Sequence, residues 1–298
     1  MINHLKFINY AHNLASKNFG KTFPNPSVGC IIIKNNKIIS KGVTSSTGRP
    51  HAEEIALKKA GKKAIGASMY VTLEPCFHSS QNGSCTDQIL RSGIKEIYIS
   101  CVDQDPRTKN KSISKLKRNK IKVVAGLEKN KTININKFFF KSLLKQKPFT
   151  KVKMAISSDE KIAWSNYKSK WITNSKSRSY VHKLRSNSQA ILTTSKTIIK
   201  DNPRFTVRKN NKIIKHLNVV LIDRNLNIPL SAYILKNLHE RRVIIFTSKK
   251  NTKSKQLKQL GCEIIEMKTE HNKLNLKKIF THLYKLKISD LLVEAGGI

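Results

Sequence analysis

The sequence predicts an α/β fold made of two domains. Apolar runs of strand length alternate along the chain with segments whose apolar residues recur at helical spacing, an alternation typical of α/β proteins. With 298 residues, the chain is long enough for two domains that each bury a core. No period of about 20–50 residues repeats, which excludes a solenoid. We place the domain boundary at Lys147-Pro148, so the expected domains are 1–147 and 148–298.

The first domain is expected to combine short helices with apolar strands. A hairpin over 27–42 should turn at Asn35-Asn36, because asparagine tolerates the left-handed backbone of a tight turn. The segment 130–150 shows little periodicity before an apolar patch and is interpreted as the boundary region. The other expected elements are helices over 7–17 and 52–60, a strand over 69–75, a helix from Cys85, and strands over 96–103 and 121–126.

The second domain is expected to follow the same alternation. Its strands are short and rich in Ile, Val and Leu, which is typical of strands buried inside a sheet. The final strand runs into a glycine-rich turn at Gly296. We expect strands over 151–157, 190–195, 218–223, 242–248, 262–267 and from 290 onward, with helices over 175–185 and 274–287.

The formal charge of +40 raises the question of nucleic-acid binding, because basic side chains neutralise phosphates. Only 11 of the 58 basic residues are Arg, and the Lys residues are scattered among Asn and Ile rather than gathered in a stripe. We therefore expect no specific nucleic-acid partner. No run approaches the roughly 18 apolar residues of a membrane span, and the first residues lack the features of a secretory signal. We expect a cytoplasmic protein without a membrane partner.

His51 and Glu53 stand at the start of the helix expected over 52–60, with Pro50 before it and Gly61 after it. Helix positions two apart point about 200° away from each other. His51 must therefore lie at the helix cap, and Glu53 in the first turn, if both side chains serve one site.

The five cysteines form an odd set in a chain without an export signal, so a disulfide framework is not expected. Cys76 follows a strand, and Cys85 opens a helix with Ser84 as N-cap and Asp87 three residues later. His51, Cys76 and Cys85 form a three-ligand zinc set that leaves a fourth position for water, as in a catalytic site.

Glu53 would then carry protons beside the metal, as the non-ligand Glu does in zinc deaminases with an H-x-E and P-C-x-x-C signature. Here His51-Ala52-Glu53 and Pro75-Cys76 match that signature, but the second cysteine follows after nine positions. A structural zinc remains an alternative, because such sites want four protein ligands and His78 could supply the fourth.

The chain resembles the bifunctional deaminase/reductase of riboflavin biosynthesis over nearly its whole length. The motifs of the first domain are Asn25-Pro26, Val28-Gly29, His51-Ala52-Glu53, Glu74-Pro75-Cys76-Phe77-His78 and Cys85 at the longer spacing. The resemblance implies a cytidine-deaminase-like zinc domain that removes the 2-amino group of a diaminopyrimidine bearing a ribosylamino 5′-phosphate. It also implies that Asn25 and His78 bind substrate, His78 in preference to the metal.

The motifs of the second domain are similar to the family's dihydrofolate-reductase-like domain, which reduces the ribosyl chain with NADPH. They are Lys153, Ser157 and Asp159, then Ser169 and Trp171 in "SKWITNS", Leu184-Arg185, and Thr197, Asp201, Pro203, Thr206 and Arg208. The resemblance implies cofactor contacts from Ala155, Trp171, Thr197, Asp201 and Gly296. It implies substrate contacts from Lys153, Ser169, Arg185, Phe205, Arg208 and Glu294, the two arginines being suited to the phosphate. It further implies a homo-oligomer built through the reductase half.

Three departures from the family pattern qualify these expectations. Glu160 stands where glycine is usual, and "SSQNGS" over 79–84 replaces a segment favouring Gly and Pro-Pro. The sequence stops at Ile298, before a helix that follows in the family, so the reductase domain looks truncated. We expect it to bind NADPH weakly or not at all, unless a partner chain restores the surface. The alternatives are a deaminase with a vestigial reductase domain, a base deaminase acting on RNA, and a non-catalytic protein held together by zinc.

Overall fold

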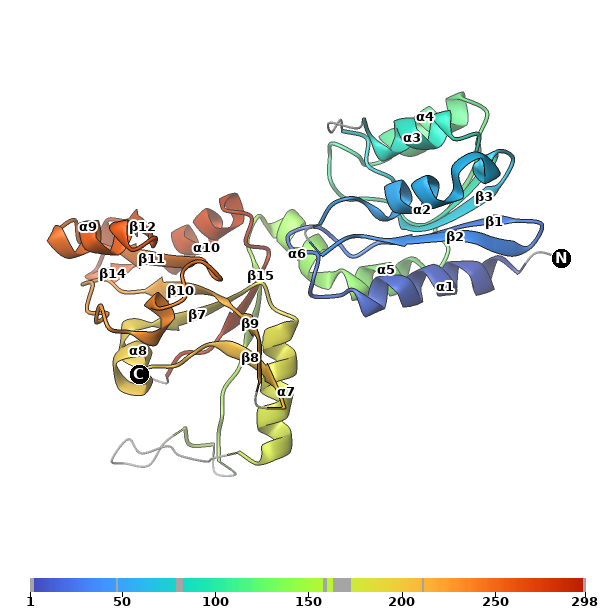
Figure 1. Ribbon diagram of the computed structural model, residues 1–298. Helices are drawn as coiled ribbons and strands as arrows, with labels where there is room; N and C mark the ends of the chain where they lie inside the picture. The colour runs from blue at the N-terminus through green and yellow to red at the C-terminus, as the bar shows by residue number, and fades with distance from the viewer. Residues whose placement is uncertain are drawn as a thin grey trace. The chain divides into compact units, whose positions relative to one another are not determined.

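The computed structural model describes residues 3–46, 48–78, 83–157, 160–162, 173–210 and 212–296. The chain divides into two compact units, Met1–Lys145 and Gln146–Ile298 (Figure 1). Each unit has its own sheet and its own apolar clusters.

Within the described part of the first unit, one mixed sheet has the strand order β2-β1-β3-β4-β5. The β1–β2 and β1–β3 pairs are antiparallel, whereas β3, β4 and β5 run parallel. In Figure 1, α2, α3 and α4 lie on one side of this sheet, and α1 and α5 on the other. The elements are α1 (His4–Lys17), β1 (Gly29–Lys34), β2 (Lys37–Val43), α2 (Ala52–Ala60), η1 (Gly61–Ala64), β3 (Ser68–Leu73), α3 (Cys85–Arg91), β4 (Glu96–Cys101), α4 (Lys111–Arg118), β5 (Lys122–Ala125), α5 (Lys129–Ile135) and α6 (Lys137–Lys145).

Two glycines let helices approach this sheet closely. A Cβ on Gly29 would lie 2.0 Å from the carbonyl oxygen of Ala11 in α1, and a Cβ on Gly42 would lie 2.1 Å from that of Ala52 in α2. Neither distance leaves room for a side chain. Gly42 therefore fixes how near the first turn of α2 lies to β2.

The expected hairpin is confirmed, since β1 and β2 are joined at Asn35 and Asn36, whose φ values are 50° and 59°. The segment interpreted as a weakly periodic boundary region holds two helices, α5 and α6. The helical periodicity of apolar residues is weak in this segment because polar side chains pack inward: Thr132 and Asn136 are fully buried. Asn136 accepts a hydrogen bond from the Ser27 N–H and donates one to the Ser27 carbonyl.

In the described part of the second unit, six parallel strands form a sheet in the order β12-β11-β10-β7-β15-β6. Two short hairpins, β8–β9 and β13–β14, accompany it. The elements are β6 (Phe149–Val152), α7 (Ser175–Ser186), β7 (Ala190–Thr194), α8 (Ser195–Asp201), β8 (Thr206–Lys209), β9 (Lys212–His216), β10 (Asn218–Ile222), η2 (Tyr233–Leu235), β11 (Val243–Thr247), α9 (Thr252–Gln259), β12 (Glu263–Glu266), β13 (Thr269–Glu270), β14 (Lys273–Leu274), α10 (Leu276–Lys285) and β15 (Asp290–Val293).

Alternating residues along the strands of this sheet belong to two different apolar clusters. Val243 and Ile245 of β11 pack with Leu257 of α9, whereas Ile244 and Phe246 pack with the α10 side chains. Because β15 lies between β6 and β7, the carboxyl ends of these three strands are neighbours. In open parallel sheets, ligands bind at this edge.

The first strand of this unit is shorter than expected and lies earlier in the chain. We expected a strand over 151–157, but β6 covers Phe149–Val152. Its partner β15 ends at Val293, and the last ladder bond runs from the Lys153 N–H to the Val293 carbonyl. Among the described residues, no strand pairs with the alternating pattern beyond Lys153, so this pattern does not extend β6.

Glu160, which replaces the family's glycine, has a left-handed backbone with φ of 60°. Its N–H donates to the carbonyl of Ser157, and the Ser157 N–H donates to the carbonyl of Lys161, which closes a turn. Glycine adopts this conformation without steric cost. The left-handed backbone therefore suits the glycine that the resemblance leads us to expect at this position.

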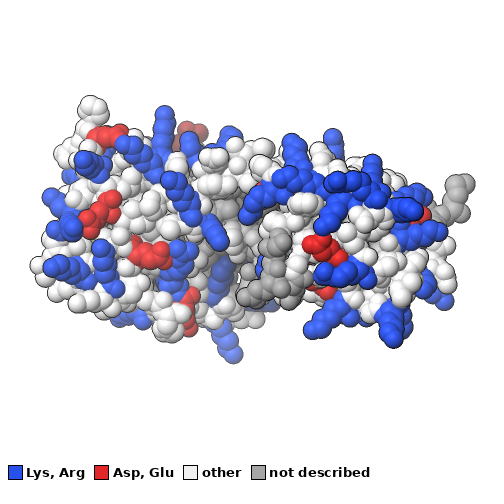
Figure 2. Space-filling view, turned by 90° about the horizontal axis from the view of Figure 1, so that it is seen from above, with Lys and Arg blue, Asp and Glu red and all other residues white. Residues whose placement is uncertain are grey.

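The basic side chains are dispersed on the face drawn in Figure 2, with acidic side chains between them. All five cysteines are free and buried. Among the described residues, no helix combines the length and the apolar character needed to cross a membrane.

Candidate functional site

His51 is the N-cap residue of α2, as predicted from the sequence, and Glu53 lies in the first turn. The backbone of His51 is extended, with φ of −73° and ψ of 163°, as is usual for an N-cap residue. Gly61 ends the helix at its C-cap with φ of 52°. These two caps confirm the expected bounds of the helix.

Cys76 lies three residues after the end of β3, and Cys85 is the first residue of α3. The predicted capping box is present: Ser84 Oγ accepts from the Asp87 N–H, and the Asp87 carboxylate accepts from the Ser84 N–H at 3.4 Å. Thr86 joins the two segments, since its hydroxyl donates to the Cys76 carbonyl at 2.9 Å.

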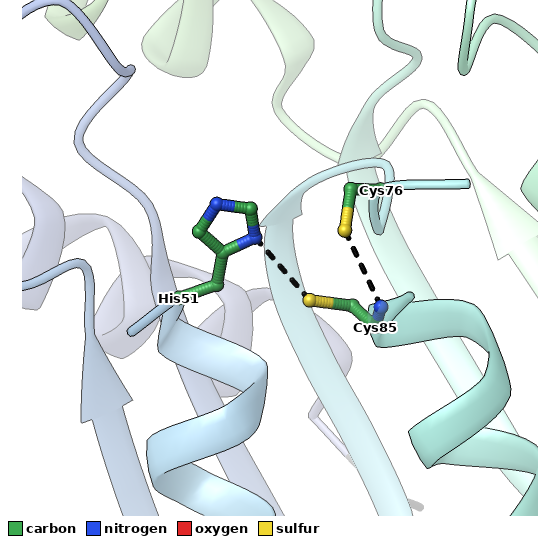
Figure 3. A group of neighbouring side chains, drawn as sticks. All are labelled: His51, Cys76 and Cys85. Carbon is green, nitrogen blue, oxygen red and sulfur yellow. Dashed lines mark hydrogen bonds between the residues drawn. The ribbon is translucent and has the colours of Figure 1, made fainter. Parts of the chain in front are cut away.

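These elements bring His51, Cys76 and Cys85 together (Figure 3). One ligand atom from each residue lies within 4.8 Å of the other two. His51 Nδ1 is 3.3 Å from Cys85 Sγ, and the Cys85 N–H donates to Cys76 Sγ at 3.3 Å. An imidazole nitrogen and two sulfurs at these separations fit the donor set of a zinc ion with one position left for water.

Charge and burial favour proton transfer beside this cluster. Burial raises the pKa of Glu53 to about 7, although its attraction to His51 opposes the rise. The side-chain hydrogen bond with Cys85 lowers the pKa of Cys76, which favours the thiolate form that binds metals. Glu53 is 4% exposed, so its carboxyl group is shielded from bulk water. A carboxyl group that titrates near neutral pH can both accept and release a proton.

The side chain of His78 does not belong to the group of ligand atoms around His51. Its Nδ1 is buried without a hydrogen-bond partner among the described residues, and its ring is electrostatically coupled to Asp105. Asn25 donates its amide to the carbonyl of Gly48 at 2.8 Å, three residues before His51. Their expected substrate contacts stay predictions.

A second group of expected site residues meets at the carboxyl edge of the parallel sheet. Lys153 follows β6, Glu294 follows β15, and their side chains form an ion pair with an Nζ–Oε2 distance of 3.3 Å. Arg185 of α7 binds the same carboxylate through two hydrogen bonds, of 2.7 and 2.9 Å. The expected phosphate contact of Arg185 would thus have to form beside Glu294.

The expected cofactor residues Thr197 and Gly296 are in contact, since the Gly296 N–H donates to Thr197 Oγ1 at 3.2 Å. Asp201 and Arg208 are exposed, and Ala155 is partly exposed. Phe205 is buried with φ of 44°, and the Arg185 guanidinium carbon lies 5.9 Å from its ring centre. Ser169 and Trp171, also expected at this site, lie outside the described residues, as does Asp159.

Three residues near these sites were given no role in the sequence analysis. Glu54 accepts a hydrogen bond from the His51 N–H. The sequence feature that could have predicted this contact is a glutamate at the third position of the helix, which is typical of a capping box. Buried Glu74 accepts backbone N–H bonds from Asp103 and Asn110 and so ties the end of β3 to the loop after β4. His182 Nδ1 accepts from the Arg208 N–H, a contact between α7 and β8 that no local pattern encodes.

A His/Cys/Cys cluster with a buried glutamate, joined in one chain to a parallel-sheet unit, defines a two-domain protein with a zinc-dependent deaminase domain. Family models agree: residues 1–101 match the cytidine and deoxycytidylate deaminase zinc-binding region, and residues 148–298 match the RibD C-terminal domain. The riboflavin biosynthesis protein RibD of Aquifex aeolicus (strain VF5) is 39% identical over 290 residues, which are 97% of this chain and 80% of that protein.

Solved structures give the same result. Acinetobacter baumannii RibD superposes with a TM-score of 0.87 at 33% identity, covering 98% of this chain and 80% of that one. A second match is a Thermotoga maritima protein described as a diaminohydroxyphosphoribosylaminopyrimidine deaminase/5-amino-6-(5-phosphoribosylamino)uracil reductase. It superposes with a TM-score of 0.84 at 32% identity, with the same coverage of both chains. The chain belongs to the RibD family of bifunctional riboflavin-biosynthesis enzymes, which combine deaminase and reductase domains.

Proposed function

We propose that this chain performs two successive reactions of riboflavin biosynthesis. The first removes an amino group from a 2,5-diamino-6-(5-phosphoribosylamino)pyrimidinone, and the second reduces the ribosyl chain of the product. The substrates follow from the name of the Thermotoga maritima relative. The observation that carries the proposal is the cluster of His51, Cys76 and Cys85 next to buried Glu53. In this proposal, residues 1–147 form the deaminase domain and residues 148–298 the reductase domain.

In the deaminase domain, His51, Cys76 and Cys85 hold zinc. The ion supplies Lewis acidity, which lets water act as a nucleophile at neutral pH. Glu53 accepts a proton at its carboxylate and returns one to the departing amino group, a role suited to its pKa of about 7. Its burial keeps bulk water from exchanging that proton.

Asn25 and His78 orient the pyrimidine in this proposal. Asn25 is held by its bond to Gly48, close to His51 in the chain, and His78 follows Cys76 by two residues. His78 Nδ1, which has no hydrogen-bond partner within the described part of the chain, is a polar atom that a substrate can satisfy.

In the reductase domain, NADPH supplies the hydride. Ala155, Trp171, Thr197, Asp201 and Gly296 form the proposed cofactor contacts, of which Thr197 and Gly296 already touch each other. Lys153, Ser169, Arg185, Phe205, Arg208 and Glu294 form the proposed substrate contacts. The ion pairs of Glu294 hold Lys153 and Arg185 at the sheet edge where such ligands bind. In this proposal the exposed Arg208 binds the phosphate, which a guanidinium can pair with through two hydrogen bonds.

We also propose that the enzyme is cytoplasmic and forms a homo-oligomer through its reductase half. Two reduced cysteines as metal ligands suit a reducing compartment. Light scattering of the whole chain would test the oligomeric state.

The direct test incubates the purified chain with the diaminopyrimidine nucleotide, with and without NADPH, and follows ammonia release and NADPH oxidation separately. We expect ammonia in both cases and NADPH oxidation only after deamination. Ammonia release without NADPH oxidation would leave a deaminase with a vestigial reductase domain. Ammonia release from RNA but not from the nucleotide would contradict the proposal.

A further inference from the structure

Glu54, the residue after the proton-carrying Glu53, reaches the metal-binding cluster from a different direction. Its Oε1 atom accepts the backbone N–H of His51 at 3.1 Å. The same oxygen lies 3.9 Å from His51 Nδ1 and 4.0 Å from Cys85 Sγ. One carboxylate oxygen thus contacts the backbone of one metal-binding residue and approaches the side chains of two.

The charge of Glu54 has a partner on the outer side of the cluster. Arg49 Nη1 lies 3.4 Å from Glu54 Oε1, and the Arg49 side chain is 40% exposed whereas that of Glu54 is 11% exposed. The pair therefore runs from the protein surface to the edge of the cluster. Arg49 directs the carboxylate and compensates its charge, which is costly to leave alone at a nearly buried position.

The carboxylate also satisfies an N–H group that the helix itself leaves free. The first N–H groups of a helix have no carbonyl partner within the helix. His51 is the N-cap of α2, so the bond from its N–H to Glu54 fixes the backbone from which the imidazole ring projects. In metal sites, such outer contacts orient the ligands and tune metal affinity.

The second helix at the cluster has a comparable carboxylate without these contacts. Asp87 occupies the same third position of α3, closes a capping box with Ser84, and pairs with Lys115 at 2.6 Å. No contact between the Asp87 side chain and a cysteine sulfur or the imidazole is found among the described residues. Asp87 therefore stabilises a helix start, whereas Glu54 stabilises a helix start and also faces the metal ligands.

We infer that Glu54 is a positioning residue of the zinc centre: its carboxylate, held by Arg49, fixes the imidazole of His51 against Cys85. This inference rests on the proposed zinc site of the deaminase domain. It separates two neighbouring acids by role, since Glu53 moves protons and Glu54 sets the ligand geometry.

The test measures zinc affinity by competition with a chromogenic chelator, using the whole chain. Glu54→Ala and Glu54→Leu both remove the oxygen, and the second refills the space if the first does not fold. We expect both to weaken zinc binding by about 10–100-fold. Glu54→Gln keeps an oxygen that can accept the His51 N–H, so it should restore affinity to within about threefold of the parent chain. The visible spectrum of the Co²⁺-loaded protein should change in Glu54→Ala and return in Glu54→Gln.

Asp87→Asn is the matched control, because it weakens the other capping box without removing an atom next to a ligand. It should lower the melting temperature and leave zinc affinity within about twofold of the parent. Equal zinc affinity in the parent, Glu54→Ala and Glu54→Leu would overturn the inference, as would an equal loss in Asp87→Asn. A parent chain that binds no zinc would instead contradict the proposed function itself.

Discussion

The guanidinium of Arg185 and the carboxylate of Glu294, 109 positions apart in the sequence, form a nearly buried ion pair with two hydrogen bonds. The Arg185 side chain is 16% exposed and the Glu294 side chain 6%. Although burial raises the pKa of Glu294, Arg185 and Lys153 more than offset this rise, so the carboxylate stays charged. The pair joins α7 to the end of β15 at the edge where we place the reductase substrate.

Glu294→Gln should therefore impair the reductase domain and leave the deaminase domain intact. The substitution leaves Arg185 without its main counter-charge, and we expect a loss of about 3 kcal/mol in the free energy of unfolding of the second unit. NADPH oxidation should fall while ammonia release is unchanged, which makes the first reaction an internal control. Glu263→Gln is a matched comparison, because the Arg242–Glu263 pair has the same 2.7 and 2.9 Å bonds but is about 40% exposed. It should cost less than about 1 kcal/mol.

Glu53→Gln should abolish deamination without releasing the metal. Glutamine has nearly the same shape but cannot accept a proton, so kcat should fall by about 10²–10⁴-fold. Zinc content and the melting temperature should stay close to those of the parent chain, since Glu53 is not among the three ligand residues. A variant that retains more than about a third of the parent's kcat would remove Glu53 from the proposed mechanism.

The buried His12 should make the first unit sensitive to acid. Its Nε2 lies 2.9 Å from the Thr132 hydroxyl and 3.1 Å from that of Ser100, and burial lowers its pKa from 6.5 to about 4. The unfolded chain therefore binds a proton before the folded chain does. The stability linked to His12 is complete above pH 6.5 and is lost as the pH falls toward 4, by on the order of 3 kcal/mol.

Urea unfolding at pH 7, 5.5 and 4 measures this effect. His12→Gln should lower stability at pH 7 and flatten the decline toward pH 4. The control is His239→Gln, because His239 is 76% exposed and should leave the pH dependence as in the parent. An unchanged slope in His12→Gln would contradict the assignment.

Glu160→Gly should stabilise the turn that follows β6. A glycine relieves the left-handed backbone at φ of 60°, and we expect a gain of up to about 1 kcal/mol. Lys161→Gly, one position later in the same turn, should have the opposite sign, because Lys161 has no left-handed backbone to relieve. Thermal unfolding of the second unit compares the two. A loss of stability in Glu160→Gly would contradict this prediction. It would show that the Glu160 side chain stabilises the fold by more than the left-handed backbone destabilises it.

Local signals in the sequence were enough to place the zinc-binding residues. The extended cap at His51 follows from Pro50 and helical spacing, and the start of α3 follows from Ser84 and Asp87. These features depend on neighbours within a few residues, which a sequence displays directly. The resemblance to the family then suggested roles, which stay predictions, for residues that local spacing does not assign, such as Lys153 and Glu294; the structure shows that these two side chains form an ion pair.

Features that depend on distant partners escaped prediction. The buried face of α5 presents Thr132, whose hydroxyl donates to the carbonyl of Thr72 on β3, so no apolar stripe marks that helix. In the hairpin of β8 and β9, the neighbouring residues Ile213 and Ile214 are 39% and 60% exposed. This part of the sequence therefore lacks the alternation of apolar and polar residues that is expected of a half-buried strand. Glu54 also approaches Cys85, which lies 31 positions later in the sequence at the start of another helix.

The central claim, that His51, Cys76 and Cys85 bind one zinc ion, is tested most directly by the metal content of the purified chain. Atomic absorption after dialysis should give about one zinc per parent chain. In Cys85→Ser the zinc content should fall well below half of that value, and ammonia release should disappear with it. A parent chain without zinc, or a Cys85→Ser chain that keeps its full zinc content, would contradict the account.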